Sequence, residues 1–134
     1  MSTQFINPDG MMKSPAFSQA VITQGVGKTI YIGGQNAVDE NGKPVGKYDI
    51  AKQTEQIMKN IGLALEAAGA NYKDIIKLNV YAMDGVDIRK GFEAASKFIG
   101  DNPSPPIVTA IFVARLGSPD YLVEVEAVAF IPDN

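Results

Sequence analysis

The stretch from Pro105 to Phe130, PPIVTAIFVARLGSPDYLVEVEAVAF, decides how this chain folds. It consists of two runs rich in β-branched and aromatic residues, separated by a Gly-Ser-Pro-Asp turn at 117–120, and it predicts two long strands. Residues two apart share a face of a strand, so Glu124 and Glu126 lie on the same side of the second strand. Two carboxylates on a mostly apolar strand must reach water, a partner or a pocket. They are therefore the most informative polar residues of the chain.

The composition limits the chemistry that this chain can perform. With 134 residues, 46% of them hydrophobic and 20% charged, it is long enough for one domain, 1–134, with an ordinary core. It contains no cysteine and no histidine, which excludes disulfides, thiolate catalysis, Ser-His triads and the commonest metal ligand. We therefore expect no metal and no cofactor. Any catalysis must use carboxylates, lysine, arginine, tyrosine, hydroxyls, backbone groups or water.

The charge pattern disfavours nucleic acid and the bilayer as partners. Net charge is −3, and no run of lysine and arginine supplies the basic surface that a phosphate backbone requires. No apolar run approaches the roughly 20 residues that span a bilayer, and the N-terminal MSTQFINPDG lacks the layout of a signal peptide. The expected location is therefore the cytoplasm.

Hydrophobic periodicity predicts the order β-β-α-β-α-β-β, preceded by a short edge strand near Phe5. The predicted elements before the opening stretch are strands at 20–24, 28–33 and 76–81, and helices at 49–68 and, capped by Asp84 or Asp87, up to about Gly100. Glycines at 25 and 27 predict a hairpin between the first two of these strands. Gly33 and Gly34, followed by Gln35, permit close approach by a ligand or another chain, although a β-bulge is the simpler interpretation.

Both predicted helices are amphipathic, so each needs a surface to lie on. Their apolar faces are Ile50, Thr54, Ile57, Met58, Ile61, Leu65 and Ala68 in the first, and Ile88, Phe92, Ala95 and Ile99 in the second. Gln53 falls off the first stripe and needs no special role. The predicted fold class is α+β, with both helices packed on one face of a mainly antiparallel or mixed sheet.

The other face of that sheet is predicted to need a partner. We expect it to carry Val108, Ala110 and Phe112 beside Glu124, and the chain has no third helix to cover them. An exposed apolar patch of this kind usually marks a subunit interface, so the pattern predicts a homo-oligomer.

Several segments together resemble the RidA family of reactive-intermediate deaminases, also called the YjgF/UK114 family. They are Ser14–Ala20, Ile32–Gln35, Leu65–Ala70, Asp74–Tyr81, Val113–Leu116 and Val123–Ala127. The resemblance covers nearly the whole chain. It implies a chorismate-mutase-like fold assembled as a homotrimer, with ligand clefts between subunits. It also implies hydrolysis of reactive enamines and imines to 2-keto acids and ammonia.

The resemblance also implies where a site would lie, and this chain departs from the family there. The arginine that holds the substrate carboxylate in active members falls at Val108, which has neither charge nor donor. The family's tyrosine falls at Phe17, its cysteine at Ala110, a polar or acidic neighbour at Phe112, and its asparagine near Phe92. Glu124 matches the acidic residue associated with the catalytic water, and the Gly34 backbone is retained. Arg115 cannot replace the missing arginine because it lies on the opposite face, further along.

Three interpretations remain open at this level. One is hydrolysis of an imine of a non-standard kind, with Glu124 activating water and the Gly34 carbonyl orienting the substrate nitrogen. Another is a non-catalytic trimer that binds a neutral or apolar small molecule, in which Glu124 is an interface residue and Glu126 an exposed or structural carboxylate. The third, an endoribonuclease, is a label that the family also carries. The lack of histidine and of a basic stripe disfavours it.

Overall fold

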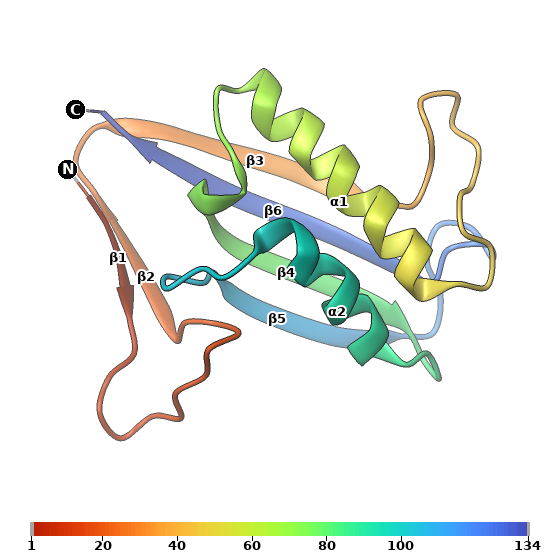
Figure 1. Cartoon of the computed structure of the whole chain (residues 1–134), viewed down its shortest axis with the longest axis horizontal. Helices are drawn as coiled ribbons and strands as arrows, with labels where there is room; N and C mark the ends of the chain where they lie inside the picture. Colours follow the sequence, from red (N-terminus) through yellow and green to blue (C-terminus); the bar gives the residue numbers. More distant parts are fainter. Residues whose placement is uncertain (1, 134) are drawn as a thin grey trace.

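The computed structural model describes residues 2–133, in which two helices lie on one face of a mixed sheet (Figure 1). The elements are β1 (Ser2–Ile6), β2 (Ala20–Gln24), β3 (Gly27–Gln35), α1 (Ile50–Ala67), the 3-10 turn η1 (Tyr72–Asp74), β4 (Ile75–Met83), α2 (Ile88–Ile99), β5 (Ile107–Val113) and β6 (Val123–Pro132). The main sheet has the order β3-β6-β4-β5, in which β4 and β5 run parallel and the other pairs antiparallel. The predicted α+β class is confirmed.

The strands form where the sequence predicted them, but they pair differently. The two strands of the opening stretch are not neighbours, because β4 lies between them. The predicted hairpin at residues 25–27 is wrong, since β2 pairs with β1 and β3 pairs with β6. Gly27 instead stands at a corner between two sheets, where a side chain would collide with Phe130 and the Ile131 carbonyl. The glycine therefore serves close packing on β6 and not a hairpin turn.

Helix α1 forms as its pattern predicted. Asp49 caps it, its carboxylate accepting a hydrogen bond from the Lys52 amide at 3.1 Å. The predicted stripe packs on β3, β4 and β6, and Ile57, Ile61 and Leu65 are fully buried. Neither helix within residues 2–133 combines the length and hydrophobicity needed to cross a bilayer.

Helix α2 is rotated relative to its predicted orientation. Asp87 caps it, but the buried residues are Gly91 and Ala94, and Phe92 is 42% exposed. The reason is the close approach of α1, because a Cβ at Gly91 would lie 3.2 Å from the Thr54 hydroxyl. Small residues take the contact with α1, and Phe92 stays partly exposed beside that contact.

The register corrects the predicted faces of the sheet. Val108, Ala110 and Phe112 lie opposite Leu78, Val80 and Ala82, whose side chains face the helices, so all three belong to the helix side. Glu124 lies opposite Tyr81 and therefore faces away from the helices. Alternation along a strand shows which residues share a face, but it cannot show which face the helices cover.

Gln53 is a structural residue that the sequence pattern missed. It is 1% exposed, and its amide nitrogen donates to the carbonyls of Asp120 at 2.9 Å and Gly46 at 3.2 Å. Its amide oxygen accepts from the Leu122 backbone amide at 2.8 Å. One side chain thus joins α1 to the loop before it and to the turn before β6.

Replacing Gln53 with leucine should lower the free energy of unfolding by about 2–4 kcal/mol, because the Asp120 carbonyl and the Leu122 amide would lose their bonds to its side chain in a dry site. Urea unfolding followed by circular dichroism measures the change. Gln56→Leu is the matched control, because within residues 2–133 the amide of Gln56 donates to the Asn60 side chain alone, and its loss should cost under about 1 kcal/mol. Equal losses in the two variants would contradict a specific role for Gln53.

Candidate functional site

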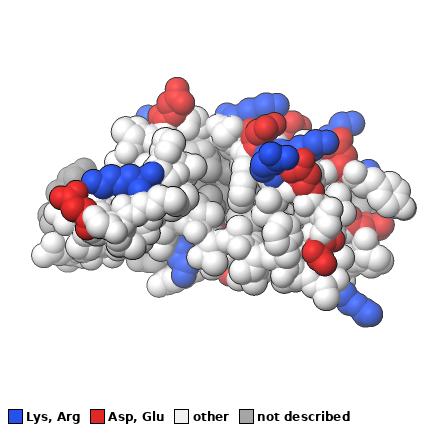
Figure 2. Space-filling model, turned by 90° about the horizontal axis from the view of Figure 1, so that it is seen from below, with Lys and Arg blue, Asp and Glu red and all other residues white. Residues whose placement is uncertain are grey.

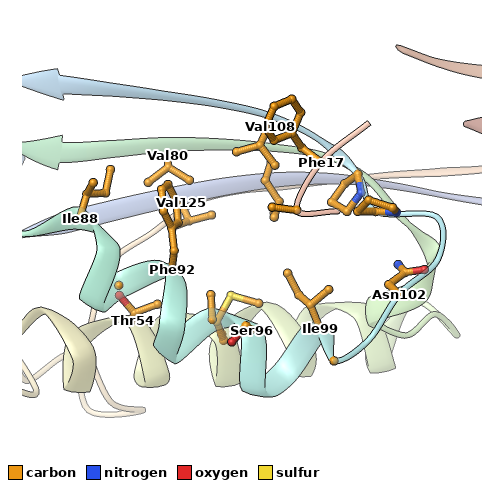
Figure 3. A pocket seen from close by; sticks show the side chains of 18 of the residues that line it. Phe17, Thr54, Val80, Ile88, Phe92, Ser96, Ile99, Asn102, Val108 and Val125 are labelled. Atoms are coloured by element: carbon orange, nitrogen blue, oxygen red, sulfur yellow. The ribbon is translucent and has the colours of Figure 1, made fainter. Parts of the chain in front are cut away.

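A cavity of about 600 Å³ lies between α2, the helix side of the sheet and the loop that joins α2 to β5 (Figure 3). We call it the helix-side cavity. Val80, Val108 and Val125 form its wall on the sheet, and Phe92 projects into it from α2. Its volume is that of a pocket for a small organic molecule.

The N-terminal loop closes one end of the helix-side cavity. Ser18 is 2% exposed, and its amide donates to the Pro106 carbonyl at 3.0 Å while its hydroxyl donates to the Pro105 carbonyl at 2.5 Å. These bonds hold the preceding residue, Phe17, against the cavity beside Val108 (Figure 3). Three predicted pocket residues, Phe17, Phe92 and Val108, therefore line the same cavity.

The helix-side cavity offers little polar chemistry. Among the described residues that line it, none is a lysine or arginine, and the one charged residue is Asp101. The Thr54 hydroxyl donates to the Ile50 carbonyl at 2.8 Å, and the Ser96 hydroxyl donates to the Glu93 carbonyl at 2.7 Å. Both hydroxyls donate their protons to carbonyls of their own helices, so neither is left to donate to a ligand. The cavity therefore suits an uncharged, mostly apolar molecule.

Glu124 lies against the glycine pair of β3, away from the helix-side cavity. The register of β3 and β6 shifts between Ile32 and Gln35, so the simpler interpretation of the glycines, a β-bulge, is confirmed. A Cβ on Gly34 would collide with the Glu124 carboxylate, whereas Gly33 has open space. The carboxylate thus lies directly against the backbone of Gly34, in space that a side chain at position 34 would occupy.

The predicted site residues therefore fall into two groups. Phe17, Phe92 and Val108 line the helix-side cavity, while Gly33, Gly34, Gln35 and Glu124 lie around the bulge of β3 and β6. Ala110 and Phe112 belong to neither group. They lie on the outer strand β5, and both are exposed. The two groups lie on opposite sides of the sheet, because Glu124 faces away from the helices and the cavity lies on the helix side.

A hydrogen-bonded cluster on the open face of the sheet was not predicted. The Tyr81 hydroxyl donates to Glu126 Oε1 at 2.5 Å, and the Asn79 amide donates to the same oxygen at 3.0 Å. The hydrogen bond from Tyr81, helped by that from Asn79 and the charge of Lys77, lowers the pKa of Glu126. The same bond raises the pKa of Tyr81. Glu126 is thus a structural carboxylate, one of the two roles predicted for it.

The Tyr81–Glu126 bond should make stability depend on pH in two windows. The pKa of Glu126 is lowered, so the ionised carboxylate stabilises the folded protein at pH values above the usual glutamate range. This stabilisation is lost as the pH falls through the pKa of Glu126 in the folded protein. The pKa of Tyr81 is raised, so the protonated hydroxyl stabilises the folded protein at pH values below the usual tyrosine range. This stabilisation is lost as the pH rises through the pKa of Tyr81 in the folded protein. Tyr81→Phe should therefore destabilise the protein at neutral pH and have less effect at acidic pH.

Urea unfolding across a pH series measures this dependence. Tyr31→Phe, which removes a hydroxyl from a side chain that is 80% exposed, is the control and should give the same curve as the native chain. A Tyr81→Phe effect that persists unchanged into acid would show that the bond to Glu126 is not its cause.

No three carboxylate side chains within residues 2–133 converge to hold a metal ion. The helix-side cavity likewise presents no basic side chain, among the described residues, for a phosphate-bearing cofactor. Its chemistry is therefore that of apolar surfaces, amides, hydroxyls and the single carboxylate of Asp101.

Comparison with known proteins places these features in a family context. A family model described as endoribonuclease L-PSP matches residues 11–131. A RutC family protein of Pyrococcus abyssi is 38% identical over 114 residues, which are 85% of each chain. The human 2-iminobutanoate/2-iminopropanoate deaminase is 33% identical over 113 residues, 84% of this chain and 78% of that protein.

Solved structures agree with the sequence matches. A protein of unknown function from Yersinia pestis, YyfB of the conserved Rid protein family, superposes with a TM-score of 0.84 at 32% identity. The match covers 98% of this chain and 100% of that one.

Proposed function

This chain belongs to the RidA (YjgF/UK114) family, and from that premise we propose that it hydrolyses imines or enamines whose carbon skeleton carries no free carboxylate. The observation that carries the proposal is Val108 in a cavity without a basic side chain among its described lining residues. The human relative is named for two carboxylated imines. A carboxylate brought into an apolar cavity without a cation loses its hydration with no compensation.

Glu124 is the proposed general base. It would take a proton from water as the oxygen attacks the imine carbon, while the electron pair of the C=N bond moves to nitrogen. Glu124 then returns the proton to nitrogen, which gives an amino alcohol. Glu124 next takes the hydroxyl proton and passes it to the amino nitrogen, the C–N bond breaks with its electron pair going to nitrogen, and ammonia leaves as the carbonyl forms, so that imine and water give ketone or aldehyde and ammonia. The carboxylate rests on the backbone of Gly34, whose carbonyl is proposed to orient the substrate nitrogen.

The working unit is proposed to be a homotrimer, with clefts in which the Glu124 of one protomer meets the helix-side cavity of another. Two observations support self-association. The outer strand β5 carries no charged residue, and its Ile111 and Phe112 are 45% and 54% exposed. Seen from the β5 side, the surface is largely uncharged, and charged side chains gather over the helices (Figure 2). An exposed apolar edge strand of this kind is normally covered.

The cytoplasm is the proposed location.

The test compares two imines made in place by oxidases. An amine oxidase acting on a simple arylalkylamine supplies a carboxylate-free imine, and an amino-acid oxidase acting on the matching amino acid supplies the carboxylated one. We expect the protein to accelerate ammonia release from the first and not from the second. Acceleration confined to the carboxylated imine would overturn the proposal.

A second candidate is binding without turnover, which the shortage of titratable groups in the helix-side cavity favours. In that case ligand would bind, ammonia release would stay at the uncatalysed rate, and Glu124→Gln would leave affinity unchanged. The endoribonuclease role has less support, because the chain has no histidine and a net charge of −3.

A further inference from the structure

We infer that the open face of the sheet docks on a second copy of this chain, and that Lys77 of one copy forms an ion pair with Asp101 of the next. The inference rests on the proposed homotrimer, in which Glu124 of one protomer meets the helix-side cavity of another. It adds the pair of residues that aligns the two copies, and so brings Glu124 to the cavity.

Lys77 differs from every other cationic side chain of the described residues. The remaining lysines and arginines within residues 2–133 are all exposed, whereas Lys77 is half-buried on the open face of the sheet. No carboxylate oxygen of the described residues lies within 4.0 Å of its Nζ. A half-buried ammonium group without an ion pair is costly, so an anion from outside the protomer would stabilise it.

The nearest carboxylate does not fill this role. The charge of Lys77 acts on Glu126, but the side-chain hydrogen bonds that Glu126 accepts come from Tyr81 and Asn79. The surface beside these residues is hollowed, because a depression of about 260 Å³ is lined by Lys77, Asn79 and Glu126 together with residues 31–33 of β3. A Cβ on Gly33 would meet no atom within 4 Å. Lys77 is therefore open to a side chain from another chain.

Asp101 supplies a matching anion on the surface that is proposed to receive Glu124. It is the one charged residue among the described residues that line the helix-side cavity, and it is exposed. No lysine or arginine nitrogen of the described chain lies within 4.0 Å of its carboxylate. Each copy thus carries an unpaired cation on the face of Glu124 and an unpaired anion beside the cavity. A head-to-tail contact that repeats around a ring would pair every one of them.

The spacing of these groups allows both contacts to form at once. Tyr81, which lies opposite Glu124, is four residues from Lys77 along β4, a separation of about 13 Å. Helix α2 lines the cavity from its first residue to its last, Ile88–Ile99, over about 16 Å. The cavity is therefore long enough for Glu124 to reach it while Lys77 reaches Asp101, which follows the end of α2.

Analytical ultracentrifugation of charge-reversed variants tests the inference. Lys77→Glu and Asp101→Lys each place like charges across the contact, and each should raise the concentration of half-dissociation by at least about tenfold. The double variant restores the ion pair with its charges exchanged and should return to within about threefold of the native value. Repulsion between residue 77 and Glu126 of the same copy is present in Lys77→Glu and in the double variant alike, so it cannot explain the recovery.

Lys59→Glu is the matched control, because it makes the same change in net charge on α1, where Lys59 is exposed and forms no ion pair with the described residues. It should leave association unchanged, and combining it with Asp101→Lys should not restore association. Lys77→Met removes the charge without reversing it and should weaken association less than Lys77→Glu. Thermal melts show that each variant is folded before its association is measured.

Single reversals that leave association unchanged, or a double variant as dissociated as the single ones, would overturn the inference. If the native chain associates in that case, the proposed assembly stands and only the ion pair fails. A native chain that stays monomeric overturns both. If the double variant recovers and no imine is hydrolysed, the ion pair stands and only the catalytic proposal fails.

Discussion

Replacing Glu124 with glutamine should lower the rate of imine hydrolysis by about 10²–10⁴-fold, the usual contribution of one general base. The substitution keeps the size and shape of the side chain against Gly34 but removes its ability to accept a proton from water. Its effect should fall on kcat and leave KM nearly unchanged, because the group acts on water and does not grip the substrate. Ammonia release from the carboxylate-free imine measures both constants.

Glu126→Gln is the matched control for this experiment. It alters a carboxylate on the same face of β6, two residues away, whose oxygen is already bonded to Tyr81 and Asn79. The control should lower stability through the loss of those charge-assisted bonds and leave kcat within about threefold of the native value. If Glu124→Gln changed kcat as little as the control, the catalytic role would be refuted and binding without turnover favoured.

Local features of the fold could be predicted from the sequence, and long-range ones could not. The start of α1 at Asp49 and its apolar stripe depend on neighbouring residues, so the pattern predicts them directly. The placement of β4 between β5 and β6 depends on pairing between distant segments, which periodicity does not report. The error about the faces of the sheet followed from this, because the register of β5 on β4 decides that Val108 faces the helices.

The candidate site was predictable to a different degree in each of its parts. The joint location of Phe17, Phe92 and Val108 came from the family resemblance, because the three lie far apart in sequence and share no pattern. The separation of Gly34 and Glu124 from this cavity could not be predicted, because it follows from the pairing of β6 with β3 and β4.

Gln53 shows the same limit in the core. A polar residue beside an apolar helical stripe is usually solvated, and the sequence offers nothing to distinguish it from Gln56. Its three partners come from the loop before α1 and the turn before β6, so burial and satisfaction appear together only when the chain is folded.

Val108→Arg should increase affinity for a carboxylated imine by about 30- to 4,000-fold, the range expected for one guanidinium–carboxylate contact. Val108 is the second residue of β5 and lines the helix-side cavity, so the new side chain would start where a ligand is expected. A guanidinium offers two parallel charge-assisted bonds to a carboxylate, whereas the native cavity offers none from its described lining residues. The preference between the paired imines should therefore reverse in this variant.

Val108→Met separates charge from size in this experiment, because it lengthens the side chain without adding a donor. The methionine variant should keep the native preference for the carboxylate-free imine, and the arginine variant should lose it as a charge enters an apolar cavity. Melting curves are measured for both, since a half-buried cation on the outer strand lowers stability. A folded Val108→Arg protein that gains no affinity for the carboxylated imine would show that the ligand does not approach β5. Residue 108 would then not determine which class of imine the protein accepts.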